Sequence, residues 1–254
     1  MTTTRPITHR YEDPLDLVWL RCASTLGYTI TRSDEVYASF DGERVIRLST
    51  ESDFDADDSL AQLIFHELCH AIVAAPAGLH LEDWGLDNTS ERDLVQEHAT
   101  HRLQAHLADR YGLRPLLAVT TQWRPYWDRL GRDPLVAHRD SPDDPAVPLA
   151  RAARLRADRE PWASAFRTAL AATATMADLA RPAPTETSSD SLWSKVSARV
   201  HERHPLGHRL GPVGATCAGC AWSRSGHDPA EPPAPGYSRP APALRCEMSR
   251  VGTG

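Results

Sequence analysis

The sequence has few of the features that mark secreted, membrane-spanning or nucleic-acid-binding proteins. Its 254 residues include only five unevenly spread cysteines, which is unlike a disulfide framework. No stretch of about 18 apolar residues is present, so no membrane span is expected, and residues 1–16 lack the apolar segment of a signal peptide. The net charge is −6 without a long basic run, so nucleic acid is not an expected partner. These absences favour a cytoplasmic protein; the oligomeric state stays open.

The remaining composition predicts a folded α+β protein that is mostly helical. Hydrophobic residues make up 41% of the chain, enough for a packed core. Residues 1–180 are expected to form one domain. Residues 181–190 read RPAPTETSSD, which is typical of a linker, and residues 191–254 form a smaller Cys/His-rich tail.

Hydrophobic periodicity and end signals predict several helices and one β-hairpin. Gly27 is expected to cap the first helix, Asp55 or Asp57 to begin the second, and Pro76 to end it. Asp41-Gly42 predicts a two-residue turn between strands 36–40 and 44–49. The expected helices cover residues 14–27, 60–75, 90–112, 115–130, 149–179 and 191–203.

The most informative motif is HExxH within the apolar run LIFHELCHAIV. His66 and His70 are four residues apart, so both imidazoles project from one face of a helix and can reach one zinc ion. Glu67 lies about 100° further round the helix, where it can reach a zinc-bound water rather than the metal. The carboxylate then serves as the general base when that water attacks a carbonyl group. A helix that is apolar all round is usually buried, so its three ionisable groups need partners or a metal. The alternative is a pair of hydrogen-bonded core histidines with a salt-bridged glutamate.

A catalytic zinc normally has three protein ligands, so one more must come from elsewhere. The metzincin pattern is excluded, because Val73 and Pro76 stand where it requires glycine and histidine. Glu97 is the preferred ligand, because it lies inside the expected helix over 90–112 and in register with inward-facing positions. Glu91 and His101 are the main alternatives. The wider set of candidates also contains Glu82, Asp93 and His98.

The stretch from His66 to Leu107 resembles zincin-like metallopeptidases of the gluzincin branch. Its spacing is most similar to ImmA/IrrE-type domains, in which HExxH is followed by a glutamate 27 residues after the second histidine; here that stretch reads QEHATHRLQ. The resemblance implies a catalytic zinc held by His66, His70 and Glu97, with Glu67 as general base. It also implies a peptide or protein substrate that pairs with an edge strand before the HExxH helix.

The tail carries a second candidate metal site. Cys217 and Cys220 form a C-x2-C pair, and Cys246 follows after 25 intervening residues. This spacing favours a structural zinc in a reducing compartment. His204 is the preferred fourth ligand, with His208 and His227 as alternatives. An iron–sulfur cluster with one non-cysteine ligand, or a redox-active or inert cysteine pair, would explain the same residues.

Two classes of function fit these observations. The first is a zinc-dependent metallopeptidase that hydrolyses peptide bonds with a zinc-activated water. The second is a catalytically silent sensor or protein-binding module with the same fold and structural metal sites. The intact HExxH motif favours the enzyme.

Overall fold

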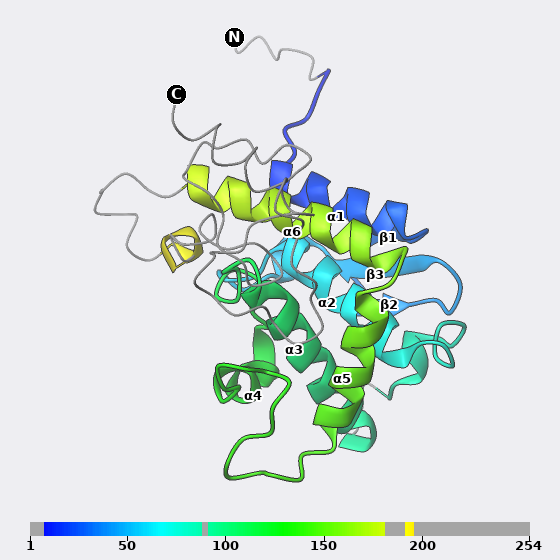
Figure 1. The fold of residues 1–254 in the computed structure, drawn as a ribbon. Helices are drawn as coiled ribbons and strands as arrows, with labels where there is room; N and C mark the ends of the chain where they lie inside the picture. Colours follow the sequence, from blue (N-terminus) through cyan, green and yellow to red (C-terminus); the bar gives the residue numbers. More distant parts are fainter. Residues whose placement is uncertain (1–7, 88–90, 181–190, 196–254) are drawn as a thin grey trace, which may run out of the picture.

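The computed structural model describes residues 8–87, 91–180 and 191–195, and these form a mostly helical α+β arrangement (Figure 1). The mostly helical α+β class predicted from the sequence is therefore confirmed for this part of the chain. Its six α-helices are α1 (Pro14–Thr25), α2 (Leu60–Ala74), α3 (Leu94–Asp109), α4 (Arg124–Asp128), α5 (Ala146–Ala157) and α6 (Trp162–Leu179). The three strands are β1 (Thr29–Ser33), β2 (Ala38–Phe40) and β3 (Val45–Ser49).

The strands form one mixed sheet in the order β1-β3-β2. β2 and β3 are antiparallel, as the hairpin prediction required, whereas β1 pairs with β3 in parallel. The predicted two-residue turn is wrong in detail. The Asp41 N–H donates to the Val45 carbonyl, and the Asp41 carboxylate accepts the backbone N–H groups of Glu43, Arg44 and Val45, so the loop spans residues 42–44.

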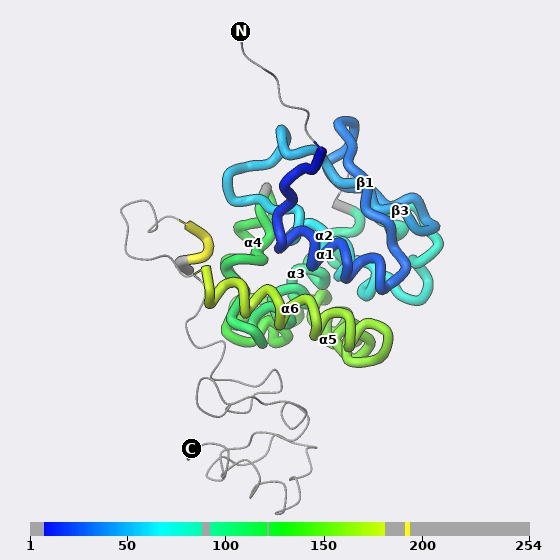
Figure 2. The backbone as a smooth tube through the Cα atoms, turned by 90° about the horizontal axis from the view of Figure 1, so that it is seen from above, coloured from blue at the N-terminus to red at the C-terminus, as the bar shows by residue number. Residues whose placement is uncertain are grey.

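Helix α2 lies at the centre of the molecule because nearly all of its faces are apolar. It packs against α1, α3, α5 and β3, while α1 and α6 lie side by side (Figures 1 and 2). The Ser59 hydroxyl accepts the Gln62 N–H and caps α2, so the predicted caps at Asp55 or Asp57 are wrong. Gly27, at φ +87°, follows the end of α1, as predicted. The helix that carries the HExxH motif is thereby held on several sides.

Two helix predictions need correction. The stretch expected to be one helix over 149–179 contains α5 and α6, which are separated at residues 158–161 because Pro161 cannot continue a helix but can precede one. The helix expected over 115–130 is reduced to a 3₁₀ turn at Thr121–Trp123 and the short α4. Residues 113–120 instead form a largely buried segment that has no regular helix. The segment contacts α3 through the hydrogen bond from Gln104 to the Leu117 carbonyl.

One buried ion pair anchors the connection between α3 and α5. Arg102, on α3, is only 3% exposed and donates to Asp144 Oδ2 at 2.7 Å. The same guanidinium donates to the carbonyls of Pro134 and Val136 and to the Tyr126 hydroxyl. Asp144 Oδ1 accepts the backbone N–H of Ala146 at the start of α5. Arg102 therefore binds the loop after α4 to the helix that also carries the candidate site.

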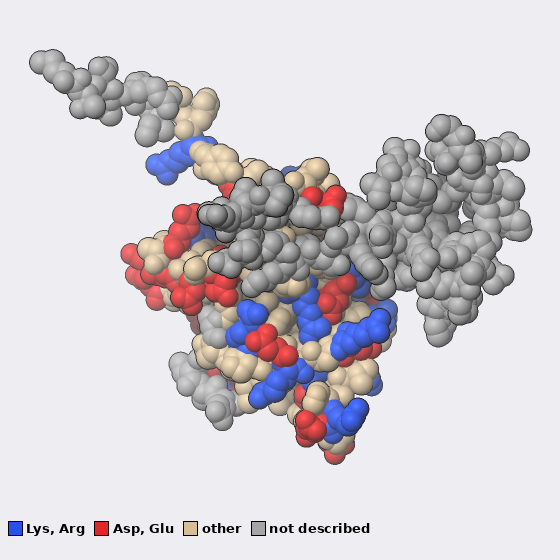
Figure 3. All heavy atoms as spheres, turned by 90° about the vertical axis from the view of Figure 1, so that its left-hand side faces the viewer, with Lys and Arg blue, Asp and Glu red and all other residues tan. Residues whose placement is uncertain are grey.

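The predicted linker 181–190 and the predicted tail metal site of His204, Cys217, Cys220 and Cys246 lie outside the described residues. Within the part that the structure describes, no helix has the length and apolar character needed to cross a bilayer. On the face drawn in Figure 3, acidic and basic side chains of the described residues are interspersed, and acidic groups gather along one edge.

We predict that Asp144→Asn destabilises the fold by about 3 kcal/mol, because it leaves a buried guanidinium without its counter-charge. Asparagine keeps the oxygen that accepts the Ala146 N–H, so the loss reports on Oδ2, which pairs with Arg102 and accepts the Tyr126 hydroxyl. Urea unfolding measures the change, and Asp140→Asn is the control, because Asp140 is 88% exposed. The control is expected to stay within about 0.5 kcal/mol of wild type. Equal midpoints for the two variants would contradict the anchoring role of Arg102.

Candidate metal centre

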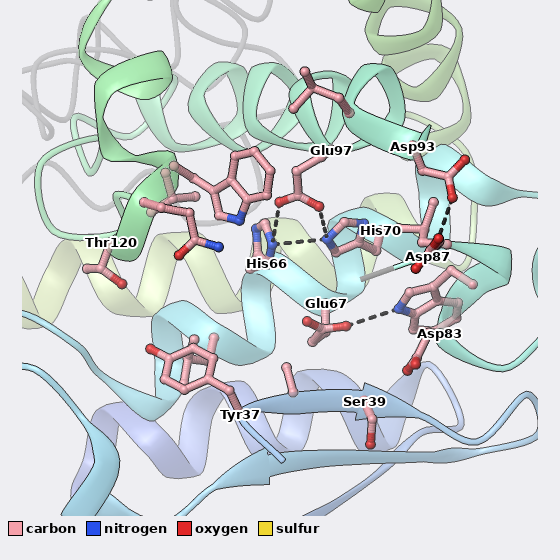
Figure 4. A pocket seen from close by; sticks show the side chains of 18 of the residues that line it. Tyr37, Ser39, His66, Glu67, His70, Asp83, Asp87, Asp93, Glu97 and Thr120 are labelled. Atoms are coloured by element: carbon pink, nitrogen blue, oxygen red, sulfur yellow. Dashed lines mark hydrogen bonds and ion pairs between the residues drawn. The ribbon is translucent and has the colours of Figure 1, made fainter. Parts of the chain in front are cut away.

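Three potential metal ligands converge where α2 packs against α3 (Figure 4). His66 Nε2 and His70 Nε2 are 3.0 Å apart. Glu97 places Oε1 3.3 Å from His66 Nε2 and Oε2 3.2 Å from His70 Nε2. Two ligands bound to zinc at about 2.0–2.1 Å with tetrahedral angles would be about 3.3 Å apart. The three side chains are therefore spaced as a single metal ion requires, and they form a group that could hold one.

The outer nitrogen of each histidine is held by a side chain of α3. Gln104 donates its amide N–H to the Leu117 carbonyl, so its oxygen must accept, and the Nδ1 of His66, 2.8 Å away, must donate. Thr100 donates its hydroxyl proton to the Gln96 carbonyl, so its oxygen accepts from Nδ1 of His70 at 3.2 Å. Both neutral imidazoles therefore carry their proton on Nδ1, and both Nε2 atoms present lone pairs to the cluster.

Two lone pairs and a carboxylate facing one another repel unless a positive charge lies among them. Burial alone lowers the pKa of His66, yet the hydrogen bond and charge of Glu97 raise it to about 9. Burial alone raises the pKa of Glu97, yet the neighbouring histidines hold it well below its usual range. A divalent metal ion would meet this demand at the place and with the ligand set that the three side chains form.

His101 stands beside Glu97 and completes the polar face of α3. Its side chain is fully buried, and its Nε2 lies 2.8 Å from Glu97 Oε1. Neither ring nitrogen makes a well-aligned hydrogen bond within the described residues. Burial lowers the pKa of His101 to about 4, so it is neutral near pH 7. A neutral imidazole at this place can hold the Glu97 carboxylate in position and adds no second positive charge beside a bound metal ion.

Glu67 does not join the three ligands. Its carboxylate lies between the ligand cluster and β2 in Figure 4 and accepts the indole N–H of Trp84 at 3.0 Å. Trp84 belongs to a 3₁₀ turn, Asp83–Gly85, in which Asp83 and Trp84 have φ values of 47° and 60°. Left-handed conformations at non-glycine residues cost about 1–3 kcal/mol each and are often found at functional sites.

A cleft of about 400 Å³ opens in front of these residues. The three ligands and Glu67 lie in its wall, and β2 contributes Ala38 and Ser39. Its charged lining is acidic apart from the two histidines, with no lysine or arginine among the lining residues that the structure describes. The carboxylates are Glu67, Asp83, Asp87, Asp93 and Glu97. Because the three ligands line this cleft, a metal ion that they hold would remain accessible to a molecule that enters it.

The other candidate ligands do not belong to this group of three. Glu82 is exposed on the segment that bridges to Asp41, and the Asp93 carboxylate accepts hydrogen bonds from Arg92 and from the Asp87 N–H. His98 stacks on Tyr126, with ring centroids 3.5 Å apart. For Glu91 the structure describes only the backbone, in a 3₁₀ turn before α3. Glu97 is therefore the acidic residue that the structure brings to the two histidines.

Three residues of the site were not found from the sequence. Thr100 and Gln104 lie three and seven residues after Glu97, the spacing of one helix face, so polar residues occupy the positions that an amphipathic helix usually fills with apolar ones. That pattern could have indicated that Thr100 and Gln104 support the site. Trp84 was missed because its contact with Glu67 depends on the conformation of a turn, which the sequence does not indicate.

Comparisons with known proteins add no family to this description. No protein-family model matches the chain, and no curated protein or solved structure matches it either. The functional proposal below therefore rests on the geometry of the described residues.

We predict that Glu97→Gln lowers zinc affinity by at least about 100-fold, because the loss of a ligand exceeds the usual effect of losing a supporting residue. Dialysis against buffered zinc followed by elemental analysis should show one fewer equivalent per chain. Glu82→Gln is the matched control, since Glu82 is an exposed glutamate outside the cluster. Equal zinc binding by the two variants would remove Glu97 from the site.

We also predict that Gln104→Leu weakens zinc binding by about 10- to 100-fold, because it frees the His66 ring and its tautomer. Isothermal titration with zinc measures the change. Gln96→Leu serves as control, because no hydrogen bond joins the Gln96 side chain to either histidine among the described residues, and its backbone carbonyl accepts from Thr100. An affinity of Gln104→Leu equal to that of the control would show that the outer hydrogen bond does not tune the site.

Proposed function

We propose that this protein is a zinc-dependent hydrolase that acts on peptide bonds. The single observation that supports this most strongly is the convergence of two Nε2 lone pairs and the Glu97 carboxylate beside a carboxylate, Glu67, that is not needed as a ligand. Two imidazoles and one carboxylate form the ligand set of zinc sites that keep an open coordination position. Nitrogen donors also favour zinc over magnesium or calcium, which prefer oxygen.

The residues around the cluster would have different roles in hydrolysis. A bound zinc ion supplies Lewis acidity, which makes a nearby water molecule easier to deprotonate. Glu67 accepts the proton of that water at Oε1, the oxygen that Trp84 does not bind, and later donates it to the departing amine. Gln104 and Thr100 keep the histidine lone pairs turned inward throughout.

The edge of the sheet supports a peptide as the substrate. The Tyr37 carbonyl accepts the Ser49 N–H, so odd-numbered residues of this edge face β3 and the N–H and C=O groups of Ala38 face away from it. Ala38 lines the cleft. An extended peptide could pair with this residue by strand addition. The next outward-facing residue, Phe40, already donates its N–H to Asp83 Oδ1, which limits the pairing at that end.

We predict that Glu67→Gln keeps its zinc and lowers the rate of peptide hydrolysis by at least about 100-fold, the usual scale of a lost general base. Glutamine preserves the side-chain size and an oxygen that can still accept the Trp84 indole N–H. Cleavage of a diverse peptide library and of a cell lysate, read by mass spectrometry, measures the rate. Glu82→Gln is again the control and is expected to match wild type.

Two outcomes would count against this function. If Glu67→Gln loses its zinc, Glu67 is a ligand or a structural residue rather than a base. If zinc-loaded wild type cleaves nothing that Glu67→Gln leaves intact in either the library or the lysate, the protein is a metal-binding sensor or partner-binding module.

A further inference from the structure

Trp84 is the residue that the proposed hydrolysis does not yet explain. The residue is 4% exposed, yet it lies in the wall of the cleft. It stacks on Phe40 with ring centroids 3.7 Å apart and an interplanar angle of 7°, and it meets Tyr28 edge to face. The ring is thus held between strand β2 and the residue that follows α1 and its capping glycine.

The hydrogen bond from Trp84 is the contact that fixes the Glu67 carboxylate. Glu67 is 7% exposed, and within the described residues it has no other hydrogen bond or ion pair. A buried carboxylate with a single donor can rotate freely once that donor is lost. A carboxylate that is free to turn would no longer keep a fixed oxygen toward the ligand cluster.

The backbone of the turn brings the indole to this position. Asp83 and Trp84 both adopt left-handed conformations, and Asp83 Oδ1 accepts the Phe40 N–H at 2.8 Å, which fixes the turn to β2. The Trp84 carbonyl lies so close to Gly78 that a Cβ there would be 2.6 Å from it. The turn is therefore held against the sheet on one side and against the segment after α2 on the other.

We infer that Trp84 is a positioning residue for hydrolysis: its indole N–H holds Oε2 of Glu67 so that Oε1 faces the metal-binding side of the cleft. A neutral donor orients the carboxylate without adding positive charge beside the metal. This inference rests on the proposed function for its kinetic consequence, but the hydrogen bond itself can be tested without a substrate.

Trp84→Phe is the decisive variant, because phenylalanine keeps a ring that can stack on Phe40 and removes only the N–H donor and part of the ring. We expect zinc content and KM to stay close to wild type while kcat falls by about 10- to 100-fold, the usual effect of losing a supporting hydrogen bond at a metal site. In a Glu67→Gln background the same substitution should change kcat no further, because the base that it orients is already gone.

Trp19→Phe is the matched control. Trp19 is also a buried tryptophan whose indole N–H is bonded, but to Thr173 Oγ1 between α1 and α6. Its loss should lower stability without a selective loss of kcat. If Trp84→Phe and Trp19→Phe have the same kcat at equal zinc content, or if the effects of Trp84→Phe and Glu67→Gln simply multiply, the positioning role is wrong.

Nitrogen-15 NMR of the full-length protein reads the hydrogen bond directly. The Trp84 indole signal is the one missing from Trp84→Phe, and it should shift in Glu67→Ala while the Trp19 signal stays in place. A Trp84 signal that is identical in wild type and Glu67→Ala would overturn the inference even if the protein is a peptidase. An inactive wild type with a shifted signal would overturn the proposed hydrolysis instead.

Discussion

Electron-rich ligand atoms that face one another inside a protein need a positive charge between them, and the packing of α2 on α3 is arranged around that need. His66 and His70 supply lone pairs from one helix, and Glu97 supplies a carboxylate from the other. Hydrogen bonds from Nδ1 of each histidine remove the option of turning the lone pair away. Without a cation the same interface would bury mutual repulsion in a region of low dielectric.

The rest of the fold supplies the support that this arrangement needs. The buried segment 113–120 offers the Leu117 carbonyl that orients Gln104. On the opposite side of the cleft, the strained turn at Asp83 and Trp84 joins β2 to the Glu67 carboxylate. His66, His70 and Glu67 thus come from α2 and Glu97 from α3. Their supporting groups come from α3, the segment 113–120 and the turn at Asp83–Gly85.

The sequence predicted the parts of the site that depend on local spacing. The i, i+4 histidines, the neighbouring glutamate and the acid within the next helix follow from helix geometry, and the β2–β3 hairpin follows from alternation and Asp41-Gly42. Strand β1 was missed because most of its residues are polar and exposed, and it is defined by its pairing with β3. Residues 115–130 and 149–179 carry helical periodicity throughout, but tertiary contacts in the first and Pro161 in the second override it. Trp84 depends on backbone conformations that no propensity scale favours.

The central claim is that His66, His70 and Glu97 hold one metal ion. Crystals of the full-length protein grown with zinc, measured on both sides of the zinc absorption edge, test it most directly. The account predicts an anomalous peak about 2.0–2.2 Å from both Nε2 atoms and from a Glu97 carboxylate oxygen, with Glu67 further away. Ordered side chains at these positions with no anomalous peak among them, in crystals containing zinc, would contradict it.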